Sequence, residues 1–193
     1  MQKIMFNERF GLQQATFDGI KIMTRRAVPE KTLEKWYDIE EDYRMAAPAG
    51  IPCYLEPMEE FLIRHAPYKV GEIVAIAQRY KDAPNLISKA VHYYGEECKA
   101  GWNNKMFVKA EYMPHHIKMT GIKVEGLAGI SDEDCLREGI IDTGSGYTCY
   151  RQGVLPLFRT PYAAFKALID KLNRRGYFES NPLVYAYTYE MID

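Results

Sequence analysis

The sequence predicts an α+β protein whose core is a small barrel of mixed or antiparallel strands with helices on its rim. Short segments rich in β-branched and aromatic residues recur along the chain, their connections are not of crossover length, and amphipathic helical patterns lie between them. At 193 residues the chain suits one domain that buries its own core. We expect a single domain over residues 1–193, with Pro-rich or polar insertions at about 27–66 and 81–105.

Alternation and turn residues locate the strands. The segment 70–77 is the clearest, because it is rich in β-branched residues and has a glycine turn at its start. Tyr185, Tyr187 and Tyr189 recur at every second position, which places them on one face of a strand. The expected strands are 20–26, 70–77, 106–110, 117–125 and 183–190.

Capping residues delimit the helices. Thr160 and Pro161 are a typical start, and Phe165 and Leu168 begin an apolar stripe behind them. Ser131 likewise predicts a helix start, and a glycine eight residues later predicts its end. The expected helices are 6–18, 30–37, 57–65, 131–138 and 161–174.

Composition restricts the class of protein. Apolar residues make up 47% and charged residues 26%, as in globular rather than disordered chains, and the net charge is −1. A chain this close to neutral grips nucleic acid through a local patch at most. Cys53, Cys98, Cys135 and Cys149 form no CxxC pair, and no apolar run approaches membrane-spanning length. We expect a cytoplasmic protein in a reducing compartment, with no membrane partner, structural disulfide or zinc site.

One short segment concentrates groups that bases and phosphates bind. Lys21, Thr24, Arg25 and Arg26 lie within six residues, directly after an expected helix end at Gly19. Arginine forms bidentate contacts, threonine hydrogen-bonds, and lysine supplies a point charge or accepts a proton. The alternative is a surface strand whose basic residues face water.

This segment, Gly19-x-Lys21-x-x-Thr24-x-Arg26, resembles the GxKxxTxR motif of the ASCH family, and three further motifs follow in that family's order. They are the segment 68–74, the strand-then-helix segment 124–140 that contains Glu138-Gly139, and the closing segment 180–190. The chain is most similar to phage and prophage-type members. The resemblance implies a PUA-like barrel and RNA or a modified nucleoside as partner.

One branch of the family is similar to bacterial N4-acetylcytidine amidohydrolases, which need neither metal nor cofactor. Their catalytic trio falls on Lys21, Thr24 and Glu138 here, so the resemblance implies hydrolysis of an acylated cytidine or a similar small amide. A desolvated Lys21 would accept the Thr24 hydroxyl proton, and Glu138 would hold or shuttle it. Two alternatives stay open: Glu138 is a solvated residue at a helix end, and a regular strand would turn Lys21 and Thr24 to opposite faces.

Four further residues are candidate substrate-binding groups. Arg26 belongs to the first motif, Arg79 follows the strand 70–77, His115 replaces the arginine of the family's Met-Pro-Arg, and Trp102 offers a stacking surface for a base. Surface ion pairing for Arg79 and packing for Trp102 are the alternative readings. The His115-His116 pair has no nearby ligand residues in the sequence, so we expect no metal site.

Other functions remain open. Asp142-Thr143-Gly144-Ser145 matches the aspartic-protease pattern, but that chemistry needs two such aspartates and the chain holds one copy, which favours a glycine-rich loop. A non-catalytic module that binds RNA or protein is the main alternative to an amidohydrolase. A structural accessory protein of a mobile element is a third.

Overall fold

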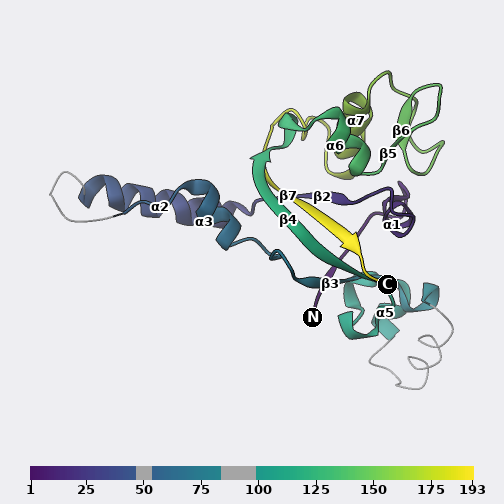
Figure 1. Ribbon diagram of the computed structural model, residues 1–193, viewed down its shortest axis with the longest axis horizontal. Helices are drawn as coiled ribbons and strands as arrows, with labels where there is room; N and C mark the ends of the chain where they lie inside the picture. Colours follow the sequence, from purple (N-terminus) through teal and green to yellow (C-terminus); the bar gives the residue numbers. More distant parts are fainter. Residues whose placement is uncertain (47–53, 84–98) are drawn as a thin grey trace.

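The computed structural model describes residues 1–46, 54–83 and 99–193 and confirms the α+β class (Figure 1). A five-stranded sheet has the order β1-β3-β4-β7-β2, and β5 and β6 form a separate two-stranded sheet. The strands are β1 (Gln2–Ile4), β2 (Met23–Ala27), β3 (Ile73–Ile76), β4 (His116–Gly126), β5 (Ile140–Asp142), β6 (Tyr147–Cys149) and β7 (Leu183–Met191).

The five-stranded sheet is mixed and open. β1 pairs with β3 in parallel, and the other neighbours are antiparallel, so β1 and β2 are its two edge strands. Its two longest strands, β4 and β7, are strongly curved (Figure 1). Their register shifts between Met119 and Gly121, and a Cβ on Gly121 would lie 2.5 Å from the Thr188 hydroxyl. Glycine therefore permits close strand contact beside this irregularity.

Short helices surround the sheet. They are α1 (Leu12–Phe17), α5 (Lys99–Asn103), α6 (Asp132–Arg137) and α7 (Pro161–Leu172), with 3-10 turns η2 (Tyr80–Asp82), η4 (Lys105–Phe107), η5 (Ala110–Tyr112) and η6 (Leu127–Gly129). The expected caps are present, since the Ser131 hydroxyl accepts from the Asp134 amide and the Thr160 hydroxyl from the Ala163 amide. The α7 stripe is buried in the core, with Phe165 and Leu168 both 1% exposed, but α7 lies mainly against α6 and the β5–β6 sheet rather than on the five-stranded sheet as predicted.

The first expected insertion forms a helical arm that projects from the sheet (Figure 1). It contains α2 (Glu30–Ala46), longer than the predicted 30–37, and α3 (Met58–Arg64), close to the predicted 57–65. Trp36 is the buried residue of α2, and its Nε1 donates to the Glu56 carbonyl at 3.4 Å. Positions 47–53 and 84–98, with Cys53 and Cys98, lie outside the described residues. No helix in the described ranges has both the length and the apolar content to cross a bilayer.

Several local predictions were wrong. Residues 106–110 are not a strand, because the segment turns through η4 and η5. Two of its carbonyls, those of Met106 and Val108, accept hydrogen bonds from Lys3 Nζ at 2.7 and 2.6 Å instead of from a neighbouring strand. The helix predicted at 6–18 begins only at Leu12. β1, β5 and β6 were not predicted. The Asp142–Ser145 segment lies at the turn between β5 and β6, where Asp142 accepts from the Gly144 amide at 2.8 Å.

The burial of α7 in the core is directly testable. Phe165→Ala should lower the free energy of unfolding by about 3–5 kcal/mol, because it leaves a cavity in the core. Lys171→Ala, at an exposed position of the same helix, should change it by less than about 0.5 kcal/mol. Urea unfolding of the two variants and the wild type measures both values. A small loss for Phe165→Ala would contradict the packing described here.

Candidate functional site

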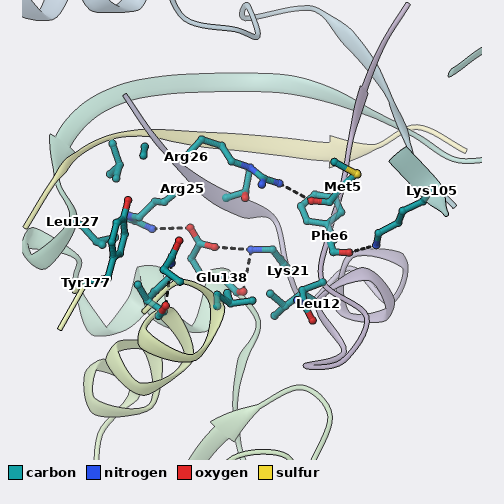
Figure 2. Close-up of a pocket in the computed structure, with 17 residues that line it drawn as sticks. Met5, Phe6, Leu12, Lys21, Arg25, Arg26, Lys105, Leu127, Glu138 and Tyr177 are labelled. Atoms are coloured by element: carbon teal, nitrogen blue, oxygen red, sulfur yellow. Dashed lines mark hydrogen bonds and ion pairs between the residues drawn. The ribbon is translucent and has the colours of Figure 1, made fainter. Parts of the chain in front are cut away.

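A cavity of about 420 Å³ lies along the free edge of β2 (Figure 2). Four consecutive residues, 24–27, line it although successive side chains of a strand face opposite ways. The cavity must therefore run beside the strand edge rather than over one face. The segment after β1, the end of α6, and α7 supply the other walls, and Lys105 reaches in from η4.

Lys21 lies on the cavity wall, just before β2 begins. α1 ends, Gly19 adopts a positive φ of 70°, and the Lys21 amide donates back to the Ala15 carbonyl at 2.9 Å. This bend precedes the regular strand, so the side-chain alternation that would separate Lys21 from Thr24 does not apply. Both residues line the cavity, with 2% and 4% of their surfaces exposed.

The ammonium group of Lys21 has an acceptor for each of its hydrogens. Nζ donates to the Met23 carbonyl at 2.6 Å, to the Glu138 carbonyl at 3.0 Å and to Glu138 Oε2 at 2.5 Å. Burial lowers the pKa of Lys21, and the negative charge of Glu138 opposes that shift without cancelling it. A neutral lysine is therefore more accessible here than in water.

Glu138 is not a solvated residue at a helix end. It is 5% exposed at the C-terminus of α6, and its two oxygens are bound by different cations, Oε2 by Lys21 and Oε1 by Arg25 Nη1 at 3.1 Å. Figure 2 shows its carboxylate between these two side chains. Gly139 follows with a φ of 97°, a conformation that lets the chain leave the helix and enter β5.

Arg25 extends this ion pair into a network. Its guanidinium, 2% exposed, also binds Glu125 at 2.6 Å and Asp134 at 3.0 Å. Lys123 closes the network through Glu125 at 2.9 Å and Asp134 at 3.3 Å. Arg137 adds a further pair, since it lies 3.8 Å from Asp134 and 2.6 Å from Glu133. Four cations thus face four carboxylates, and the side of β2 that carries Arg25 is electrostatically balanced.

Arg26 is in a different environment. Its Nη2 donates to the Met5 carbonyl at 2.7 Å, which links the free edge of β2 to the segment after β1. Its Nε is buried without a hydrogen-bond partner. On β7, the register partner of Arg26 is Tyr185, whose hydroxyl is also buried without a partner.

Three predicted substrate-binding residues do not line the cavity. Arg79 binds Glu8 at 2.8 Å and Asp82 at 2.5 Å, the ion pairing left open for it. His115 stacks on Phe17 with ring centroids 4.6 Å apart. Trp102 packs against a small hydrophobic cluster that contains Tyr80, in agreement with the alternative that it serves as a packing residue. Over the described ranges, no three His, Cys, Asp or Glu side chains group as metal ligands would.

Sequence reasoning did not assign a role to several cavity residues. Arg25 was seen only as part of a basic cluster, and its carboxylate partners are 100 to 113 residues away. Lys105 reaches the Phe6 carbonyl and lies 3.2 Å from Glu8 Oε1. Tyr177 adds an aromatic ring to the wall. No sequence signal marks Lys105 or Tyr177, since neither belongs to a motif.

Comparison of the chain with protein-family models, with curated proteins and with solved structures found no match. The resemblance to the ASCH family consequently rests on the four sequence motifs alone.

The ion network makes stability depend on pH. Burial by itself would raise the pKa of Asp134, but hydrogen bonds from Arg25 and Lys123 outweigh it and the pKa is lowered. Because the folded pKa lies below the unfolded value of about 3.9, this stabilisation is present above about pH 4 and is lost as the pH falls through the folded pKa. Asp134→Asn should cost about 1–3 kcal/mol at pH 7, and its difference from wild type should shrink below pH 4.

Urea unfolding at a series of pH values from 7 to 2 measures this difference. Asp38→Asn, on the exposed surface of α2, is the matched control and should follow the wild-type curve. A constant difference between wild type and Asp134→Asn over this range would show that the carboxylate is not held by the network.

Proposed function

We propose that the protein is a PUA-like member of the ASCH family that recognises RNA or a modified nucleoside and hydrolyses an acylated cytidine or a similar small amide without a metal ion. The observation that carries the proposal is that one cavity is lined by Lys21, Thr24 and Glu138. Glu138 ends α6, more than a hundred residues after the other two. Its volume of about 420 Å³ lies within the range of about 300–1,000 Å³ typical of small-molecule sites.

The barrel is the first part of the proposal. The curved sheet is open, but its two edges approach each other where Arg26 of β2 binds the carbonyl of Met5, just after β1. The cavity occupies this gap between the edges. The order of the four family motifs supports the barrel fold. We interpret the gap as the place where the barrel is incompletely closed, with the ligand site at this opening.

The chemistry is the second part. Transfer of one proton from Lys21 Nζ to Glu138 Oε2, 2.5 Å away, converts the ion pair into a neutral amine and a carboxylic acid. Burial lowers the pKa of Lys21, so it favours release of this proton. The neutral amine then accepts the Thr24 hydroxyl proton as Thr24 Oγ bonds to the amide carbon.

The remaining steps need water as their only added reagent. As the amide C–N bond breaks, the leaving nitrogen takes the proton of the Glu138 carboxylic acid. The acyl group stays on Thr24 as an ester, with Lys21 protonated and Glu138 ionised. Water then hydrolyses the ester, releasing the acid and restoring the threonine hydroxyl.

A second candidate is a binding module without catalysis. The specific observation in its favour is that all three hydrogens of a protonated Lys21 have acceptors, as in a purely structural ion pair. In that case Lys21 and Glu138 only shape the cavity. An assay of acid release separates the two functions, because only an amidohydrolase releases acid from its ligand.

The activity prediction uses N4-acetylcytidine in excess EDTA, with acetate release as the measurement. Wild type should release acetate, and Thr24→Ala and Lys21→Ala should abolish the activity, because one removes the nucleophile and the other its base. Glu138→Gln should lower kcat by about 10²-fold or more while changing KM less, as expected for a group that transfers a proton in the transition state.

Two controls make this result interpretable. Thr120→Ala removes an exposed threonine hydroxyl outside the cavity and should keep full activity. Melting temperatures show whether Lys21→Ala and Glu138→Gln stay folded, because loss of one partner of a buried pair is destabilising. A wild type that binds the nucleoside yet releases no acetate would establish the binding module instead.

A further inference from the structure

The cations around the cavity differ in how completely they are neutralised. Lys21 and Arg25 belong to the ion network, in which four cations face four carboxylates. Lys105 lies 3.2 Å from Glu8, a residue it shares with Arg79, and Arg79 has Asp82 as a second partner. These two groups each contain as many carboxylates as cations.

Arg26 is the exception. Among the described residues no carboxylate lies within ion-pair distance of its guanidinium, and the hydrogen bond it makes is to a neutral acceptor, the Met5 carbonyl. Its Nε has no acceptor at all although that atom is buried. Of the cavity cations in the described part of the chain, Arg26 alone carries an uncompensated charge.

The unpaired Nε is costly unless an acceptor arrives, although the side chain as a whole is half-buried and its guanidinium also lies 6.0 Å from the centre of the Phe6 ring. A buried donor without an acceptor loses its hydration and gains nothing in exchange, and the cost is larger for a charged group. An ordered water would satisfy the hydrogen bond but would not offset the charge. An anion with two or more oxygens does both, because the guanidinium fork matches a phosphate or carboxylate in two parallel hydrogen bonds.

The position of Arg26 indicates which part of a ligand it would meet. In Figure 2, Arg26 lies above the Lys21–Glu138 pair and its guanidinium points toward Met5, whereas Tyr177 and Leu127 lie to the left of the pair. The reacting amide would sit at the centre, against Lys21, Thr24 and Glu138. A group bound by Arg26 is therefore attached to the ligand away from Tyr177, the aromatic ring available to a base.

We propose that Arg26 binds a phosphate group of the ligand, so that the cavity takes a nucleotide or the phosphate-bearing end of an RNA in preference to a free nucleoside. The base is placed on the Tyr177 side and the phosphate on the Arg26 side. This inference rests on the proposed nucleoside-binding function and specifies its substrate class.

Calorimetric titration with three probes tests it: cytidine, cytidine 5′-monophosphate and cytidine 3′-monophosphate. At low salt, at least one monophosphate should bind wild type about 10- to 100-fold more tightly than cytidine, the gain typical of a charged hydrogen-bonded contact. The ratio should fall as salt is raised. Arg26→Gln should reduce it to about 1, because the neutral amide removes the charge.

Arg44→Gln is the matched control. It makes the same substitution at an exposed arginine of α2, distant from the cavity residues, and should keep the wild-type ratio. Equal reductions by Arg44→Gln and Arg26→Gln would mean that net charge, rather than a contact with Arg26, sets the preference, and would overturn the inference. Melting temperatures confirm that Arg26→Gln is folded.

The outcomes separate this inference from the function on which it rests. Equal affinities of wild type for cytidine and both monophosphates would overturn the phosphate site and leave nucleoside recognition standing. No binding of any probe at millimolar concentration would overturn both. Inorganic phosphate that binds wild type as tightly as the monophosphates, and is lost in Arg26→Gln, would support the phosphate site and count against recognition of the base.

Discussion

The buried contact between Lys21 and Glu138 determines how the parts of the site are held together. Lys21 belongs to the link between α1 and β2, and Glu138 ends α6, 117 residues later in the chain. Backbone hydrogen bonds follow the same connection, since the Ile22 amide donates to the Arg137 carbonyl at 2.9 Å. Removing one member of a buried pair typically costs about 3–5 kcal/mol. This contact, with the backbone hydrogen bond beside it, therefore joins the start of β2 to the end of α6 at the cavity.

The same contact has two opposing electrostatic influences, and their balance decides its chemistry. Burial favours the neutral amine and lowers the pKa of Lys21, because low dielectric penalises charge, whereas the negative charge of Glu138 opposes that shift. Arg25 also binds this carboxylate, because its Nη1 donates to Glu138 Oε1. Glu125 and Asp134 in turn reduce the effect of Arg25 by sharing its charge. The outer residues of the network thus contribute to the balance of charge around Lys21.

Sequence patterns predicted those parts of the fold that depend on local periodicity. The strands that became β3, β4 and β7 and the helix that became α7 follow alternation, apolar spacing and caps within a few residues of their ends. β1 was missed because three residues carry no periodic signal, and it is a strand only because β3 lies beside it. Residues 106–110 have the composition of a strand, but the carbonyls of Met106 and Val108 accept hydrogen bonds from the Lys3 side chain rather than from another strand.

The candidate site was also predictable only in part. Motif spacing brought out Lys21, Thr24, Arg26 and Glu138, which do line one cavity. It did not distinguish Arg25 from its neighbours, because that distinction depends on carboxylates more than a hundred residues ahead. Arg79 and His115 were chosen by their positions beside family segments and Trp102 by its chemical type, and their contacts lie outside the cavity. Residue type indicates what a side chain can bind, whereas the tertiary fold decides what it meets.

The position of β2 at the edge of the sheet explains why neighbouring arginines differ. In a central strand, Arg25 and Arg26 would face the two covered sides of a sheet, and each would need its own buried counter-charge. At an edge, one side can be closed by carboxylates while the other remains beside an opening. Both arginines line the cavity, but Arg25 meets Glu125, Asp134 and Glu138, whereas Arg26 meets a backbone carbonyl. The period of two along a single edge strand thus separates a cation held by carboxylates from one that has no carboxylate partner among the described residues.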